Sequence, residues 1–304
     1  MDPQPAIVAP SDAALHWVAR SIAPGASVTS VRRLTGGVTS AMHVISVADA
    51  QGRHHRCALR RWVSDHANDG PERVLREARI LERLEGTDIP APRLLATDAS
   101  GDECEEPALL MTFLDGHVEL TPKSSKEWLV QIAAMLVRIH DCQIEAPVAE
   151  SWLRPERLVV PEWTQRPDLW REAFSLMQES PPTSRPCFIH HDYQQFNLLW
   201  RRGRLASVVD WVWGSAGSPG IDVSHARLNL SVLYTSELAQ QFLDHYESLS
   251  GRTVERWWDV EGLLKYLPGW GGFLQQQAGR RLSVDFAGMH QRVEETLSLA
   301  LQRN

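Results

Sequence analysis

Residues 187–200 of this 304-residue chain read CFIHHDYQQFNLLW, and this stretch constrains the fold more than any other. Two short apolar segments that favour strands flank a polar loop, which contains Asp192 and Asn197. A third apolar segment, within LASVVDWVWG at 205–214, brings a second acid, Asp210, to a strand end. The order strand, H-x-D-x-x-x-x-N, strand, strand, acid predicts a short β unit that presents polar side chains from its loops.

These side chains have the chemistry of a metal-assisted transfer reaction. An isolated Asp after a strand is most often a turn former, so the prediction depends on the whole set and its order. Asp192 would serve as general base, and Asn197 and Asp210 would offer oxygen ligands to a hard cation. Magnesium takes few protein oxygens and leaves its other positions to water and phosphate. Phosphoryl transfer needs little more than an orienting carboxylate and metal ions at the phosphates.

The chain ahead of this stretch has the pattern of strands with one helix. Apolar residues at helical spacing predict a helix over 71–84, with Pro71 suited to its first turn. The glycine pair at 36–37 lies between two alternating segments and suits a tight hairpin. The predicted strands are 28–34, 41–48, 52–62, 92–97 and 107–114.

From about residue 122 onward the pattern becomes helical. Ser124 or Ser125 is a candidate N-cap for the first of these helices. The predicted helices are 124–142, one near 168–178, 222–232, 236–249, 255–266, 271–281 and 284–302. We therefore expect an α+β protein with two lobes, 1–114 and 115–304, joined by a hinge at 113–117.

Composition narrows the class of protein. The chain is 43% hydrophobic and 23% charged, which is ordinary for a globular protein. A net charge of −7 argues against a nucleic-acid partner and gives a weak preference for a cationic small molecule. The start lacks a signal-peptide pattern, and no apolar run approaches the roughly 20 residues of a membrane helix, so we expect no membrane association. Four cysteines without metal spacing predict a reduced, cytoplasmic protein, and the oligomeric state stays open.

The loop and the second acid resemble the catalytic loop and metal site of protein-kinase-like enzymes. They resemble the aminoglycoside phosphotransferase family, related to choline kinases, more closely, because His190, Asp192 and Asn197 match its loop and Val209-Asp210-Trp211 matches its metal segment. The resemblance implies a bilobal kinase-like fold with a small β-rich N-lobe and a larger helical C-lobe. It also implies ATP and Mg²⁺ as cofactors. The stretch 217–230, GSPGIDVSHARLNL, is similar to the family as well, and makes Asp222 a structural N-cap or loop anchor.

If the resemblance holds, the N-lobe must grip the nucleotide phosphates. A kinase uses a strand Lys paired with a helix Glu, but this chain has no Lys before Lys123. The strand CALRR offers Arg60 in that place, as in many relatives, and Glu77 lies on the next helix. Arg61 points to the opposite face of the strand and is the alternative. A surface arginine beside a surface helix is the reading without function.

Two further segments are expected at the nucleotide. The glycine-rich segment 34–43 would cover the phosphates through Gly36, Gly37, Thr39 and Ser40, although a glycine pair is also common in plain hairpins. The segment 107–116 resembles the connection between lobes. There Met111 would flank adenine, and backbone groups from Thr112 to Leu114 would bond the base. Without the resemblance this segment is simply a buried strand and a turn.

Several residues depart from the family pattern or have a structural reading. His191 replaces a residue that is usually small, and either crowds the site or lies toward the substrate. Gln195 and Phe196 replace the commoner Pro-Gly. We expect His140 to be a packing residue and His190 to orient the loop backbone.

The predicted function is ATP-dependent transfer of the γ-phosphoryl group to a hydroxyl of a small molecule, such as an aminoglycoside-like antibiotic or another amino alcohol. A kinase-fold regulator that binds nucleotide without turnover is the alternative. A protein kinase is disfavoured, since no A-P-E segment follows Asp210. Acids and tryptophans of the helical lobe could recognise the acceptor, but solvated faces and core packing explain such residues equally well. They are Asp285, Glu294, Glu295, Trp257, Trp258 and Trp270.

Overall fold

The structure is a computed structural model, and it describes residues 9–34, 40–63, 69–267, 270, 274, 277–278, 282 and 285–303. Contacts divide the chain into two compact units, one of Met1–Asp115 with Ser207–Trp213, and one of Gly116–Ala206 with Gly214–Asn304. The segment Ser207–Trp213, which contains Asp210, thus groups with the first unit, whereas the sequence places it in the second lobe. The division into functional lobes stays a prediction.

The first unit contains a five-stranded sheet with the strand order β1-β2-β3-β5-β4, and every neighbouring pair is antiparallel. Short connections join β1 to β2, β2 to β3 and β4 to β5, and such connections suit antiparallel pairs, whereas α2 (Gly70–Leu84) and β4 lie between β3 and β5 in the chain. The strands are β1 (Ser27–Arg33), β2 (Ala41–Ala48), β3 (His54–Arg61), β4 (Leu94–Asp98) and β5 (Ala108–Thr112).

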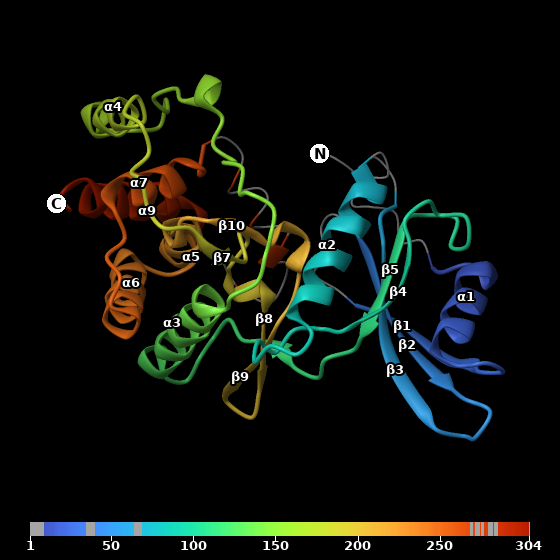
Figure 1. The fold of residues 1–304 in the computed structure, drawn as a ribbon. Coiled ribbons are helices and arrows are strands. Elements are labelled where there is room, and N and C mark those ends of the chain that lie inside the picture. Colours follow the sequence, from blue (N-terminus) through green and yellow to red (C-terminus); the bar gives the residue numbers. More distant parts are fainter. Residues whose placement is uncertain are drawn as a thin grey trace. The chain divides into compact units, whose positions relative to one another are not determined.

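Two helices, α1 (Asp12–Ile22) and α2 (Gly70–Leu84), cover opposite faces of this sheet (Figure 1). Side chains alternate along a strand, so neighbouring residues of β3 face different helices. Cys57 and Leu59 pack with Trp17 of α1 in one apolar cluster. Arg60 faces the other way and contacts α2.

Helix α1 is absent from the sequence-based expectation, which had one helix in this region. Ser11 caps it, since its hydroxyl accepts from the N–H of Ala14 at 3.2 Å. Ala14, Trp17 and Val18 then form its buried stripe. The cap and the i, i+3, i+4 spacing were signals that the sequence offered.

The second unit combines short strands with a helical body. β7 (Cys187–Ile189) pairs with β10 (Ser215–Gly217), and β6 (His117–Val118), β8 (Leu198–Arg201) and β9 (Arg204–Val208) form a three-stranded sheet in the order β6-β8-β9. These strands hold the polar loop of residues 190–197, which ends in a 3-10 turn, η3 (Gln195–Asn197).

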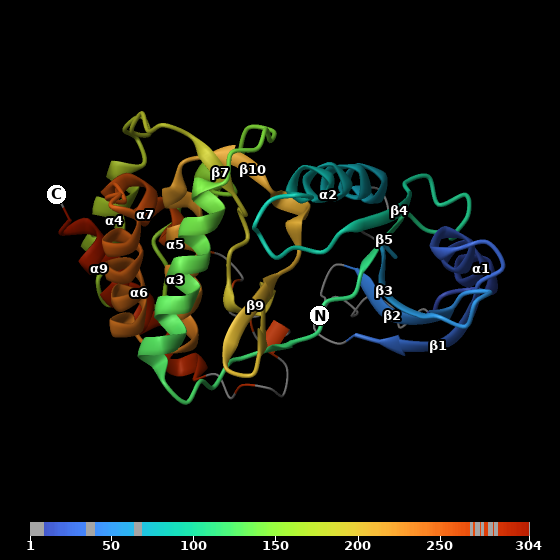
Figure 2. The ribbon, with the colours of Figure 1, turned by 60° about the horizontal axis from the view of Figure 1, so that its bottom comes forward.

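The helical body gathers around α5 (Pro219–Leu233), which contacts α6, α7 and α9 (Figure 2). Residues Gly220–Leu233 of α5 are all buried, although several are polar. Buried polar groups require partners, so the polar side chains of α5 must contact polar groups of the chain around them. The helices around it are α3 (Ser125–Asp141), α4 (Pro167–Leu176), α6 (Ser236–Ser250), α7 (Arg256–Leu264) and α9 (Phe286–Leu301), with 3-10 turns η2 (Pro155–Arg157) and η4 (Trp211–Trp213) elsewhere in the chain.

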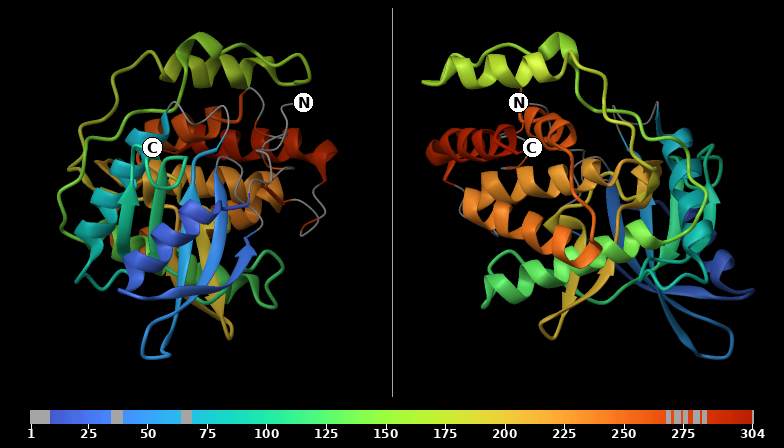
Figure 3. Two further views of the ribbon diagram at one scale, coloured as in Figure 1. Left: turned by 90° about the vertical axis from the view of Figure 1, so that its right-hand side faces the viewer. Right: turned by 60° about the vertical axis from the view of Figure 1, so that its left-hand side comes forward.

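Helix α4 packs beside α9 and closes one side of this body (Figure 3). The predicted α+β class is confirmed, with an antiparallel sheet in the first unit and a mostly helical second unit. Most of the predicted helix 271–281 lies outside the described residues. Among the helices that are described, none has the length and apolar character needed to cross a membrane.

Candidate active site

The first part of the candidate site lies in the first unit, where Arg60 of β3 meets Glu77 of α2. The Nη1 of Arg60 lies 2.9 Å from Glu77 Oε2 and 2.7 Å from Asp210 Oδ1. Its Nε donates to the Ser40 hydroxyl at 3.0 Å. One guanidinium therefore joins, through Nε and Nη1, three of the residues that the sequence analysis proposed.

Charge and burial are closely balanced in this cluster. The side chains of Arg60 and Glu77 are 6% and 1% exposed, whereas that of Asp210 is 33% exposed. Burial opposes the charge of Arg60, but Asp210 and Glu77 together raise its pKa. Burial also raises the pKa of Glu77 to about 7, against the lowering effect of Arg60. Two carboxylates share one guanidinium, so the charges of this cluster favour the binding of a further cation.

Asp210 adopts a left-handed backbone conformation with φ of 66°. This conformation is costly for a residue with a side chain and is concentrated at functional positions. The next residue, Trp211, is buried and donates its backbone N–H to Glu77. Together these features fix the Asp210 carboxylate toward Arg60.

The other residues predicted to bind the nucleotide lie in different parts of the first unit or outside the described residues. Arg61 faces away from Glu77, on the side of Cys104, so the alternative to Arg60 does not meet the helix acid. Met111 is buried on the Arg60 side of the sheet, opposite Ala58. The Thr112 N–H already donates to the Arg93 carbonyl at 2.9 Å, so Thr112 cannot use this group for a base. Leu114 lies beyond the end of β5. Gly36, Gly37 and Thr39 lie outside the described residues.

The second part of the candidate site is the polar loop of the second unit, and Asp222 of α5 anchors it. The Asp222 carboxylate accepts the backbone N–H groups of His190 at 2.7 Å and His191 at 2.6 Å. His140 lies 3.2 Å from the same carboxylate and 2.7 Å from the Tyr246 hydroxyl. Burial opposes the negative charge of Asp222, but the hydrogen bond from His140 lowers the pKa of this carboxyl group below its usual value. Of the two predicted roles, Asp222 is the loop anchor; Ser218 caps the helix, so the N-cap prediction is wrong.

Asp192 lies in this loop with its carboxylate held on both oxygens. Oδ1 lies 2.8 Å from the Gln194 amide nitrogen and 2.9 Å from His225 Nε2, and Oδ2 accepts from Asn197 Nδ2 at 3.0 Å. The Asn197 amide also donates to the Asp192 carbonyl at 2.8 Å. The Asn197 amide nitrogen is thus engaged, and its oxygen is the atom that remains for a cation.

His191 lies within the second unit rather than extending outward. Its φ is 71°, its side chain is buried, and its ring stacks on Trp152 at 4.4 Å between centroids. Its Nδ1 lies 3.2 Å from the Ser215 hydroxyl. A left-handed conformation favours glycine, so His191 adopts a backbone conformation that is costly for a residue with a side chain.

Sequence reasoning missed two residues at Asp192, His225 and Gln194. Gln194 is two residues away in the same loop, so local spacing could have indicated it. His225 lies 33 residues away on α5, and its contact depends on the tertiary fold. Its signal was a histidine one turn after the anchoring Asp222, on the same helix.

The acids at the last helix, which could recognise the acceptor substrate, form hydrogen bonds within the protein. Glu294 accepts hydrogen bonds from Thr164 and from the Trp170 indole. Glu295 accepts from Ser236, and Asp285 caps α9. Trp270 contacts His225 edge-on at 5.6 Å, so of the tryptophans considered it is placed beside the loop. Each of these acids therefore has a partner within the helical body.

A cation would have few protein ligands in this chain. Within the described part of the sequence, no group of three His, Cys, Asp or Glu side chains is arranged to hold a metal ion. Magnesium bound with phosphate needs only one or two protein oxygens, so the Asn197 amide oxygen and the Asp210 carboxylate fit this chemistry. The two residues belong to different units, and their convergence on one ion stays a prediction.

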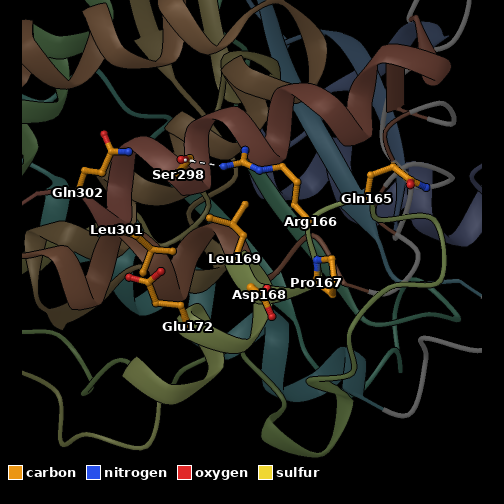
Figure 4. Close-up of a pocket in the computed structure, with 9 residues that line it drawn as sticks. All are labelled: Gln165, Arg166, Pro167, Asp168, Leu169, Glu172, Ser298, Leu301 and Gln302. Carbon is orange, nitrogen blue, oxygen red and sulfur yellow. Dashed lines mark hydrogen bonds between the residues drawn. The ribbon is translucent and has the colours of Figure 1, made fainter.

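A cavity of about 360 Å³ lies elsewhere, along α4 and the end of α9 (Figure 4). Arg166 donates to the Ser298 hydroxyl at 3.1 Å at its edge. No predicted site residue lines this cavity.

Comparison with known proteins places these features in a family. The sequence pattern of the phosphotransferase enzyme family matches residues 31–258. No curated protein matches the sequence significantly. The matched residues 31–258 include the cluster around Arg60, with Ser40, Glu77 and Asp210, and the loop of Asp192 with His225.

Several solved structures share the fold at low sequence identity. A putative aminoglycoside phosphotransferase from Ralstonia eutropha is 16% identical with a TM-score of 0.62, over 95% of each chain. A macrolide 2'-phosphotransferase from Brachybacterium faecium is 16% identical with a TM-score of 0.57, over 96% of this chain and 98% of that one. APH(2″)-IIa, solved with streptomycin and ATP, is 15% identical with a TM-score of 0.55, over 89% and 96% of the chains.

These structural matches confirm the predicted kinase-like fold, and the family match is independent of them. It spans well over half of the chain and contains the loop of Asp192, the Arg60 strand and the Asp210 segment. The chain therefore belongs to the phosphotransferase enzyme family.

Proposed function

We propose that the protein transfers the γ-phosphoryl group of ATP to a hydroxyl group of a small molecule. The observation that carries the proposal is the loop geometry: Asp222 fixes the loop backbone, and three side-chain nitrogens contact the Asp192 carboxylate and hold it in one orientation. A carboxylate held in this way can orient an acceptor hydroxyl and receive its proton. Family membership supplies the reaction class.

The first unit would hold the triphosphate in this proposal. Arg60 presents a buried guanidinium whose position is set by Glu77 and Ser40, and guanidinium groups bind phosphate oxygens in a fork. Asp210 now pairs with Arg60 and has the exposure needed to meet a cation as well. Backbone groups near Leu114 would contact adenine beside Met111, since the Thr112 N–H is already used within the sheet.

Asn197 and Asp210 would hold Mg²⁺. When bound, the ion would neutralise charge on the phosphates and help to align the transferring group. The contribution of the protein is separate: Asn197 holds Asp192 Oδ2 through its amide nitrogen. Positioning and electrostatics of this kind supply most of the rate in phosphoryl transfer.

The acceptor is proposed to be a hydroxyl-bearing small molecule of the size that the similar structures bind. Two of the similar structures contain streptomycin or gentamicin, and a third is an amicoumacin kinase in complex with AMP-PNP, Ca²⁺ and Ami. An aminoglycoside-like antibiotic or another amino alcohol is the acceptor class that we propose to test first. The aromatic rings of Trp152 and Trp270 near Asp192 suit the apolar face of a sugar ring.

One observation favours a second candidate, a nucleotide-binding regulator without turnover. The predicted metal ligand Asp210 already has a cationic partner, Arg60, at 2.7 Å. If that ion pair persisted with nucleotide bound, Asp210 would not be available as a ligand. The protein would then bind nucleotide without turnover.

A phosphate-transfer screen separates the two candidates. The purified protein would be incubated with Mg·ATP and with aminoglycosides, macrolides, choline and homoserine-like alcohols, and ADP formation would be followed. The D192A variant is the matched control, because it removes the base and leaves Arg60 in place. Acceptor-dependent ADP formation that D192A loses would support the phosphotransferase. Magnesium-dependent thermal stabilisation by ATP, without any turnover above that of D192A, would support the regulator instead.

A further inference from the structure

The carboxylate of Asp192 has an unexpected partner, His225. The His225 side chain is fully buried, and its Nε2 lies 2.9 Å from Asp192 Oδ1. The residue sits one turn after Asp222 on α5, so a single helix both anchors the loop backbone and contacts the acid of the loop. This contact lies entirely within the second unit.

Among the described residues, the His225 ring has one polar partner, Asp192. Its ring packs edge-on against Trp152 at 5.7 Å and against Trp270 at 5.6 Å. Its Nδ1 is buried and, within the described residues, forms no hydrogen bond. The backbone is held as well, because Asn229 Nδ2 donates to the His225 carbonyl at 2.9 Å. The indoles and the helix fix the ring, and Nε2 is the nitrogen that they direct at Asp192.

The hydrogen bonds at Asp192 are distributed unequally between its two oxygens. Among the residues that the structure describes, Oδ1 lies within hydrogen-bond distance of Gln194 Nε2 and His225 Nε2, whereas Oδ2 has one partner, Asn197 Nδ2. A carboxylate oxygen can accept two hydrogen bonds in directions set by its lone pairs. Oδ1 is therefore saturated, and Oδ2 retains an accepting position.

We propose that His225 is a positioning residue: it donates from Nε2 to Asp192 Oδ1, and so presents Oδ2 to the acceptor hydroxyl. The proposal rests on the proposed function of Asp192 as the acid that orients this hydroxyl. A neutral ring that donates from Nε2 carries no proton on Nδ1, which agrees with the apolar surroundings of Nδ1. His225 does not touch the acceptor and acts through Asp192.

Substitutions that keep or remove the donor test the proposal. The side-chain amide of H225Q can reach the place of Nε2, whereas H225M has a similar length and no donor. Phosphate release from Mg·ATP, with water in place of the acceptor, is the activity to measure. We expect H225Q to stay within about threefold of the wild-type rate and H225M to lose about 10- to 100-fold, the range of a mispositioned proton acceptor. Affinity for a non-hydrolysable ATP analogue should change less than twofold in both.

A control distinguishes positioning from simple loss of packing. S231A removes a buried hydroxyl from the same helix, where Ser231 contacts Thr296 and the Arg292 carbonyl. We expect S231A to lower the melting temperature and to leave the rate unchanged. An H225M rate within threefold of wild type, or an H225Q rate as low as that of H225M, would overturn the proposal.

Imidazole nitrogen NMR gives a second readout that does not depend on turnover. The expected result is a proton on Nε2 of His225 that shifts in D192N. A proton on Nδ1 with Nε2 bare would refute the contact. If the wild type does not turn over Mg·ATP or any acceptor, the proposed function fails, and this measurement still decides whether His225 donates to Asp192.

Discussion

The carboxylate of Asp222 accepts the backbone N–H of His191 at 2.6 Å, and it accepts that of His190 at 2.7 Å. The first turn of α5 thus fixes the main chain directly before Asp192. A buried carboxylate is costly unless its lone pairs are used, and here two amides and His140 use them. Loop position and helix packing therefore depend on one ionised group.

Replacement of Asp222 should destabilise the second unit and disorganise the loop. We expect D222A to cost about 3–5 kcal/mol of unfolding free energy, because His140 and two amides lose a buried partner. Urea denaturation measures this change. D244N, at an exposed position on α6, is the control and should cost less than about 0.5 kcal/mol. A cost for D222A as small as that of D244N would contradict the anchoring role.

Acid should act on the wild-type protein through the same group. The pKa of Asp222 is lowered in the folded state, so its stabilising contribution is present above the unfolded pKa of about 4 and is lost as pH falls through the folded value. Unfolding free energy measured from pH 6 down to pH 3 should fall more steeply in the wild type than in D222N. Parallel curves for the two proteins would show that Asp222 is not the group responsible.

The left-handed conformation of His191 makes a prediction about strain. Gly adopts φ of 71° freely, whereas Ala pays about 1 kcal/mol or more there. Both H191G and H191A lose the stack on Trp152, so their difference isolates the backbone term. We expect H191G to be more stable than H191A by about 1 kcal/mol in urea denaturation. If H191A were the more stable of the two, the backbone at residue 191 would not be left-handed.

Much of the fold could be predicted from sequence because local patterns determine it. The predicted strand 41–48 is observed as β2 with the same bounds, and the predicted helix 124–142 is α3, Ser125–Asp141. Alternation along β3 also placed Arg60 on the face opposite Arg61. In each case the periodicity of burial is written in neighbouring residues.

The parts that could not be predicted depend on long-range contacts. His225 resembles any buried helical histidine until the fold brings it to Asp192. Asp222 resembles an N-cap by its position near a helix start, but Ser218 is the cap and the carboxylate turns to the loop. The Thr112 N–H looked available in sequence, whereas sheet pairing engages it with Arg93. Spacing predicts which residues share a face, but not which distant group they meet.

Substitution of Arg60 should lower the unfolding free energy more than substitution of Arg56, an exposed residue of the same strand. R60M leaves Glu77 buried without its cation, so we expect a loss of about 3–5 kcal/mol in unfolding free energy. R60K keeps the charge but not the fork, and should retain the fold while weakening ATP binding about tenfold. Calorimetric titration with a non-hydrolysable ATP analogue measures the second effect.

The control for Arg60 is R56A. Arg56 is also on β3, but its side chain is 47% exposed and pairs with Asp115 at the surface. Exposed pairs contribute little, so R56A should change stability by less than about 1 kcal/mol. Equal ATP affinity in R60K and wild type would remove Arg60 from the proposed phosphate site.

Substitutions of Asp192 and Asp210 should impair different steps, turnover and nucleotide binding respectively, because the two residues belong to different clusters. D192A removes the group that orients the hydroxyl, so turnover should fall at least 100-fold while affinity for the Mg·ATP analogue stays within about threefold. D210N removes a metal ligand and an Arg60 partner, so affinity itself should fall by about tenfold or more, and added magnesium should restore it only in part. Parallel titrations of both variants with the analogue at several magnesium concentrations make the comparison. If D210N bound the analogue as tightly as D192A did, with the same dependence on magnesium, Asp210 would be only the counter-ion of Arg60, and the metal role proposed for it would be wrong.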